Sequence, residues 1–201
     1  MDDFYKDLIL LLFGFVLTTI GGMWLANWLD RTSWQRQTRI DLYKRRYEEG
    51  IQFLDTLSQL IGRRHFQLQR VLWALKDMED NPEKLEEIEE EYFEIVGDWN
   101  ASYWMHRNKI RLLVGEQYAN LFLDYGDDQR EKAHSVHYSF VQAHRAVQQA
   151  KAGEVEAEEA QEKVNDLSRV CSSFQELVTY EFRKKAASLE LLNMTKSENG
   201  G

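Results

Sequence analysis

The chain has 201 residues, which is room for one domain and a short additional segment. Hydrophobic residues make up 43% of it and there is a single proline, so the composition favours a helical globular domain over a disordered or all-β chain. The one cysteine, Cys171, excludes an internal disulfide. Its place in an apolar stripe with Phe174 and Val178 is typical of a small core residue.

The net charge of −9 is concentrated in one stretch of the sequence. Residues 77–98 contain eleven Asp or Glu and one Lys, and subtracting their net −10 from the total leaves +1 for everything else. We therefore expect a nearly neutral protein with one acidic segment, which leaves room for a local basic surface.

The first predicted element is an apolar helix near the N-terminus. The nineteen residues from Leu8 to Ala26 carry no charge, and about 20 such residues cross the hydrocarbon core of a bilayer. A cleaved signal peptide is the alternative, but the acidic start MDDFYKD and the bulky Trp24 and Trp28 do not fit one. The sequence predicts a transmembrane anchor over residues 1–30, with the spanning helix ending near Trp28.

Flanking charge predicts how this anchor is oriented. One Lys and three Asp precede the apolar stretch, whereas a basic cluster follows it. Basic flanks stay in the cytoplasm, so we expect a bacterial inner-membrane protein with its N-terminus outside and its larger domain in the cytoplasm. The basic cluster consists of Arg31, Arg36, Arg39, Lys44, Arg45 and Arg46.

Small residues form a stripe within the predicted span. Gly14, Thr18 and Gly22 are spaced by four residues, and Gly21 lies beside them. Small residues at this spacing let helix backbones approach closely in lipid, so the stripe predicts packing between spans and a homo-oligomer. Glycine is also common in spanning helices without such a role.

The rest of the chain shows apolar residues in steps of three and four, the pattern of amphipathic helices. We expect the span to continue into a first long helix ending near Asn81. Further helices are predicted over residues 82–114, 117–125, 129–152 and 155–192. The fold class is therefore all-α, with one N-terminal transmembrane helix and a cytoplasmic four-helix-type bundle over residues 31–193. Residues 194–201 are polar and expected to be a flexible tail.

Sequence motifs give little sign of catalysis. The chain lacks CxxC and HExxH metal motifs, a phosphate loop and a Gly-rich dinucleotide turn, so neither a metal nor a cofactor is expected. We expect a protein that is not an enzyme.

Basic residues form a candidate ligand-binding surface. Arg63 and Arg64 interrupt the apolar stripe of the first long helix, and Arg107, Lys109 and Arg111 lie close to Trp104 on the second. Guanidinium and ammonium groups beside aromatic rings can hold phosphates and stack bases, which would suit a nucleic-acid or oligonucleotide signal. The alternative is a solvated basic face that pairs with the acidic segment.

Arg130 and His137 are two turns apart on one helix face, and this Arg–His spacing resembles the catalytic signature of HEPN ribonucleases. That resemblance implies a helical bundle in which the histidine moves protons and the arginine holds phosphate. Glu131 departs from the uncharged polar residue that the family prefers. The alternative is that His137 and His144 are partly buried beside Phe140.

A second resemblance covers the layout of the whole chain and the stretch from Trp99-Asn100 to Leu113-Val114-Gly115. It is similar to bacterial membrane effectors of antiphage defence with one N-terminal span and a cytoplasmic helical bundle. Among them are the pore-forming CRISPR-associated accessory protein, whose bundle is HEPN-like, and the transmembrane effector of the Hailong system. Arg107-Asn108 would open the HEPN signature, but residues 112–114 are Leu, Leu and Val where its histidine is expected, which implies a fold kept without its nuclease.

Three functions follow from these patterns. The first is an oligomeric membrane effector of antiviral defence that forms or gates a pore in response to a cytoplasmic signal. The second is a membrane-tethered scaffold that docks a partner protein, for instance one from the same operon, through the acidic residues 83–94. The third is a tethered ribonuclease.

Overall fold

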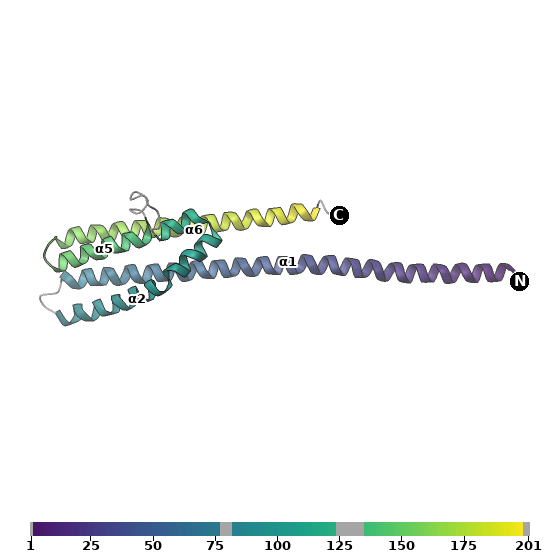
Figure 1. The fold of residues 1–201 in the computed structure, drawn as a ribbon, viewed down its shortest axis with the longest axis horizontal. Coiled ribbons are helices and arrows are strands. Elements are labelled where there is room, and N and C mark those ends of the chain that lie inside the picture. Colours follow the sequence, from purple (N-terminus) through teal and green to yellow (C-terminus); the bar gives the residue numbers. More distant parts are fainter. Residues whose placement is uncertain (1, 77–81, 124–134, 199–201) are drawn as a thin grey trace. The chain divides into compact units, whose positions relative to one another are not determined.

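The computed structural model describes residues 2–76, 82–123 and 135–198 (Figure 1). These residues form helices with short connections and contain no strand, which confirms the predicted all-α class for the described part of the chain. The helices are α1 (Asp2–Lys76), α2 (Pro82–Leu113), α3 (Glu116–Phe122), α5 (Val136–Lys151) and α6 (Ala157–Glu198).

The chain divides into two compact units, residues 1–49 and residues 50–201. The first unit contains the N-terminal part of α1, including the predicted apolar span. The second unit contains the remainder of α1 and the other helices.

Local sequence signals account for the ends of several helices. α2 begins at Pro82, as predicted, because proline has the φ angle of a first helical residue and lacks an N–H that would be unbonded there. Gly115 and Gly153 have φ angles of 124° and 73°, and these left-handed conformations follow the ends of α2 and α5. α5 begins after Ser135, whose hydroxyl accepts a hydrogen bond from the backbone N–H of Tyr138 at 3.2 Å.

Two helices differ from the predicted ranges. α5 begins at Val136 rather than Gln129, because the Ser135 side chain caps it there; residues 124–134 lie outside the described part of the chain. α6 runs to Glu198, beyond the predicted end at Leu192, because the sequence offers no glycine or proline before Gly200 to stop it. Most of the expected tail, residues 194–201, is therefore helical.

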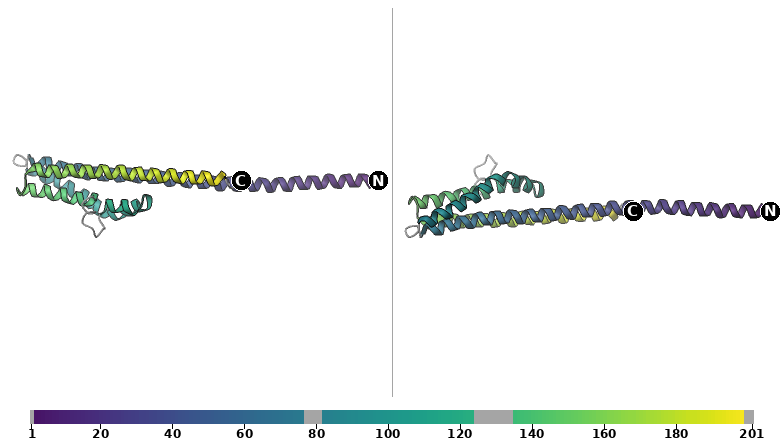
Figure 2. Two further views of the ribbon diagram at one scale, coloured as in Figure 1. Left: turned by 90° about the horizontal axis from the view of Figure 1, so that it is seen from above. Right: turned by 90° about the horizontal axis from the view of Figure 1, so that it is seen from below.

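Within the second unit, α1 and α2 pack antiparallel. Gln67 donates a hydrogen bond to the backbone carbonyl of Ile88 at 3.3 Å, whereas Arg64, earlier in α1, lies over the ring of Trp99, later in α2. α5 packs against α6, and the left view of Figure 2 shows it running beside the first part of that helix. This arrangement brings side chains from α1, α2 and α5 to a common interior.

All the helices of the second unit contribute to its core. Burial of each large apolar side chain stabilises the fold by about 1.5–3 kcal/mol, so this core provides most of the driving force for folding. Cys171 is buried here, as the sequence predicts. The largest fully buried side chains include Ile61, Leu68, Leu72, Tyr92, Trp99, Ile110, Phe122, Phe140 and Leu167.

Candidate functional sites

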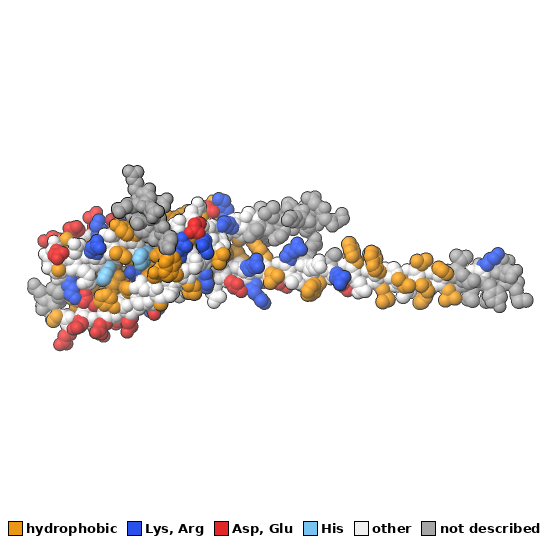
Figure 3. All heavy atoms as spheres, in the orientation of Figure 1, with side chains coloured by type: hydrophobic (Ala, Val, Ile, Leu, Met, Phe, Trp, Pro, Cys, Tyr) orange, Lys and Arg blue, Asp and Glu red, His pale blue; other side chains and the backbone are white. Residues whose placement is uncertain are grey.

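The apolar segment of the first unit has no protein cover. Every side chain described between residues 11 and 29 is exposed, and large apolar groups such as Leu11 and Trp24 are 74% and 70% exposed. Figure 3 shows these apolar side chains following one another along the helix. By length and composition this is a helix that could cross a membrane, with a mean hydropathy of 1.4 in its most apolar stretch. An apolar surface of this kind needs lipid or another protein around it.

The small-residue stripe is open to a partner. A Cβ atom built on Gly14, Gly21 or Gly22 would meet nothing within 4 Å. The Thr18 hydroxyl donates to the backbone carbonyls of Gly14 and Phe15, at 2.8 and 3.0 Å. Because the helix satisfies this hydroxyl internally, the stripe can face either lipid or another helix without an unbonded donor.

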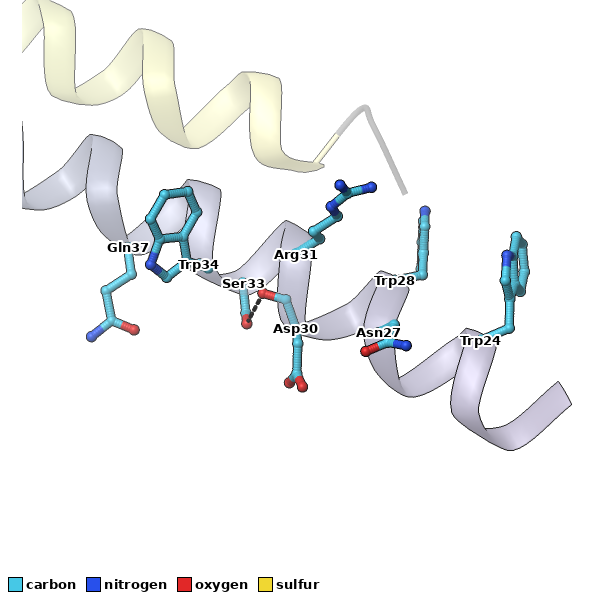
Figure 4. Close-up of a pocket in the computed structure, with 8 residues that line it drawn as sticks. All are labelled: Trp24, Asn27, Trp28, Asp30, Arg31, Ser33, Trp34 and Gln37. Atoms are coloured by element: carbon cyan, nitrogen blue, oxygen red, sulfur yellow. Dashed lines mark hydrogen bonds between the residues drawn. The ribbon is translucent and has the colours of Figure 1, made fainter. Parts of the chain in front are cut away.

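At the end of the apolar segment, tryptophans and an arginine occupy one side of the helix, and an amide and a carboxylate occupy the other. Figure 4 shows Trp24, Trp28 and Arg31 on one side, with Asn27 and Asp30 on the other. Tryptophan rings settle at the interface between lipid tails and headgroups, where one edge is apolar and the other wet. This order of residues suits a helix leaving a bilayer.

The predicted basic residues do not form one exposed surface. Arg63 is exposed, but its neighbour Arg64 is buried. Arg107 is also buried; its guanidinium donates to Glu116 at 2.5 Å and to Asn120 at 2.9 Å, which ties the end of α2 to α3. The pairing makes Arg107 a structural link within the second unit.

The two remaining basic candidates lie farther along α2. The Lys109 ammonium is 5.1 Å from the centre of the Phe53 ring, and Arg111 Nε is 3.8 Å from a carboxylate oxygen of Glu116. Arg64 instead contacts Trp99, so the structure does not gather the arginines of α1 and the basic residues of α2 in one place. A continuous phosphate-binding face is therefore not assembled by these residues.

Arg64 lies in a cage of aromatic rings. Its guanidinium carbon is 4.8 Å from the ring centre of Trp99 and 4.3 Å from that of Phe140, and the residue is only 4% exposed. Such cation–π contacts are worth about 2 kcal/mol or more when desolvated. Burial lowers the pKa of Arg64, and the electrostatic interaction and side-chain hydrogen bond with Tyr92 oppose this shift.

Several polar atoms around Arg64 have no hydrogen-bond partner. They are Nε and Nη1 of Arg64 and the hydroxyl of Tyr92, which is 1% exposed. Burial raises the pKa of Tyr92, and the Arg64 charge partly offsets that rise, so the phenol stays protonated. None of the ion pairs among the described residues includes Arg64. Sequence reasoning missed Tyr92 and Phe140, since only their register against α1 brings them to the arginine.

The histidines of α5 line the side of the second unit where α5 meets α2. Nδ1 of His137 accepts a hydrogen bond from the Trp99 indole N–H at 3.3 Å, and the His144 ring centre is 5.1 Å from that of Tyr92. Burial lowers the pKa of His144, with a further lowering from the Arg64 charge. These contacts fit partly buried polar residues of the core. Arg130, the other member of the predicted ribonuclease pair, lies outside the described residues.

No cluster of three metal-ligating side chains occurs among the described residues. Cys171 is no reactive thiol, because burial raises its pKa to about 12. Comparison with protein-family models, curated proteins and solved structures finds no match to this chain.

Proposed function

We propose that this protein is an oligomeric membrane effector of bacterial antiviral defence. Its N-terminal helix crosses the inner membrane, associates with copies of itself and forms or gates a pore under the control of the cytoplasmic second unit. The observation that carries the proposal is the exposure of the whole apolar segment from Leu11 to Leu29. The defence context comes from the resemblance of the chain layout to known effectors.

Insertion in a bilayer removes the cost of this exposure. Each large apolar side chain moved out of water contributes about 1.5–3 kcal/mol, and the helix satisfies its own backbone N–H and C=O groups, as lipid requires. The described span contains no ionisable side chain, since Lys6 precedes it and Asp30 follows it. The segment therefore meets the physical conditions for a stable span.

A single helix encloses no channel, so pore formation requires several copies. The stripe of Gly14, Thr18 and Gly22, with Gly21 beside it, offers a flat surface on which backbones can approach, and nothing in the first unit covers it. Packing there would be sensitive to added bulk. The opposite side of the helix, with Val16 and Met23, would be far less sensitive.

The experiment compares bulk added to the two sides. Gly14→Leu with Gly21→Leu should abolish oligomers of the full chain in lipid nanodiscs and the conductance of planar bilayers. Val16→Phe with Met23→Phe adds bulk opposite the stripe and should leave both unchanged. Monomers in wild-type nanodiscs, or conductance that survives in the glycine variant, would disprove the pore proposal.

A scaffold remains the second candidate, and the acidic end of the second unit favours it. The N-terminal parts of α2 and α6 both carry exposed glutamates, and acidic side chains gather at that end of the unit (Figure 3). Such a surface would attract a basic partner. Deleting residues 1–30 should leave partner binding intact for a scaffold but abolish the activity of a pore. The exposed glutamates include Glu83, Glu86, Glu87, Glu90, Glu94, Glu156, Glu158, Glu159 and Glu162.

A further inference from the structure

The interior around Arg64 has more hydrogen-bond donors than acceptors. Arg64 Nε and Nη1 and the Tyr92 hydroxyl are all buried without a partner, while the Trp99 indole N–H is already bonded to His137. Buried donors that stay unbonded destabilise a fold, and a charged group does so most. The aromatic cage offsets part of this destabilisation through the faces of the guanidinium. The Tyr92 hydroxyl is the nearby protein group that can accept from the N–H edge of Arg64, and it cannot serve both Nε and Nη1 with good geometry.

The charge is also uncompensated by protein groups. Among the described residues, no carboxylate lies within ion-pair distance of Arg64, whereas the half-buried Arg70 and the buried Arg107 each pair with a glutamate. A guanidinium is the side chain best suited to bind two oxygens of a phosphate or carboxylate at once. The residue type, its burial and its unbonded edge therefore all point to an anion.

We propose that the interior around Arg64 and Tyr92 is a binding site for a phosphate group, either free or carried by a small molecule. Its oxygens accept hydrogen bonds from Nε and Nη1 of Arg64 and from the hydroxyl of Tyr92. That this ligand controls the pore rests on the proposed function, whereas the binding itself does not.

Thermal unfolding of the full-length protein in detergent tests the binding. Inorganic phosphate at ten times its dissociation constant should raise the Tm by about 3–6 °C relative to sodium chloride at equal ionic strength. Arg64→Met should lose this increment. The variant is expected to fold, because an apolar side chain of similar volume often replaces an unpaired buried charge without loss of stability.

Two further variants separate binding from general salt effects, since phosphate also stabilises proteins by exclusion from their surfaces. Arg63→Met removes the same charge from the adjacent exposed position and should keep the full increment. Tyr92→Phe keeps the ring and removes one donor, so it should reduce the increment without abolishing it. Should Arg64→Met fail to fold, the comparison of Tyr92→Phe with Arg63→Met decides.

The source of the phosphoryl group is resolved by adding adenosine monophosphate and adenosine in parallel. A larger Tm increment with the nucleotide than with phosphate, and none with adenosine, assigns the site to a nucleotide phosphate; equal increments assign it to free phosphate. An increment of the same size in wild type and Arg64→Met, or none in wild type, overturns the proposal. The Tm increment can depend on Arg64 while the conductance of planar bilayers is unchanged by phosphate and by Arg64→Met. That result would support the binding site and disprove its role in gating.

Discussion

Gly50 occupies a place in α1 where the chain has no room for a side chain. A Cβ atom there would lie 2.4 Å from Cζ of Phe182, whose ring is buried in the core of the second unit. Glycine within a helix normally costs about 0.5–1 kcal/mol relative to alanine. The close approach of the ring accounts for a glycine at this position.

Gly50→Ala should therefore destabilise the second unit, by about 1–3 kcal/mol, because overpacking outweighs the gain in helix propensity. Gly62→Ala and Gly97→Ala are matched controls, since a Cβ at either helical position meets nothing within 4 Å. They should stabilise the unit by about 0.5–1 kcal/mol. Urea unfolding of the full chain measures all three, and a Gly50→Ala protein as stable as the controls would contradict the packing described here.

Buried histidines make the second unit sensitive to acid. Burial lowers the pKa of His65, His106 and His144, and the charge of Lys109 lowers that of His106 further. In the unfolded chain these groups titrate near pKa ~6.5. The folded state therefore binds fewer protons than the unfolded state below that pH, so stability is present above about pH 6.5 and is lost as the pH falls.

The Tm should fall between pH 7.5 and pH 5, and His106→Phe should make the fall smaller. Phenylalanine suits this position because the His106 ring stacks on Phe53 at 5.7 Å and meets Phe122 edge-on at 6.5 Å. Differential scanning fluorimetry at a series of pH values gives the comparison. An equal loss of Tm in wild type and His106→Phe would exclude His106 as a contributor.

At the scale of helices, the stability of α5 depends on its N-cap residue, Ser135. Ser135 is fully buried and its hydroxyl accepts from the Tyr138 N–H, so Ser135→Ala leaves an unbonded donor in the interior. We expect a loss of about 1–2 kcal/mol in the free energy of unfolding. Ser139→Ala, one turn later and outside the cap, should change stability by less than about 0.5 kcal/mol. Equal effects of the two substitutions would argue against the cap.

Helix boundaries were predictable where one residue decides them. Pro82 begins α2, and the left-handed Gly115 and Gly153 follow helix ends, because each of these backbone preferences is local. The predicted start of α5 was wrong because many serines in a sequence could cap a helix, and only tertiary packing selects Ser135. The end of α6 was wrong because a polar composition alone does not stop a helix.

The candidate sites also differ in whether local sequence or tertiary packing determines them. The exposure of the apolar segment follows from its composition, which local sequence reveals. Burial of Arg64 does not, because arginine is usually exposed and the adjacent Arg63, with the same side chain, is itself exposed. Only the packing of Trp99 and Phe140 from two other helices distinguishes the two arginines.

At the scale of the whole molecule, the two units differ in the exposure of their apolar side chains. The first unit exposes an apolar helix, while the second buries its apolar residues in a core. The flanking charges predict the orientation of the helix in a membrane, since Lys6 is the only basic residue before the apolar stretch and several arginines follow it. The asymmetry predicts that the N-terminus lies outside the cytoplasm and the second unit inside it.

Cysteine labelling in intact bacterial cells tests this topology. Native Cys171 gives little background, since its thiol is buried and its pKa is raised to about 12. A membrane-impermeant maleimide should therefore label Lys6→Cys in intact cells, and should label the exposed Ser173→Cys only after the cells are opened. Labelling of Ser173→Cys in intact cells would place the second unit outside and remove the cytoplasmic signal from the proposed mechanism. Equal labelling of both sites only after opening would mean that the helix does not span the membrane, because both thiols would then lie in the cytoplasm.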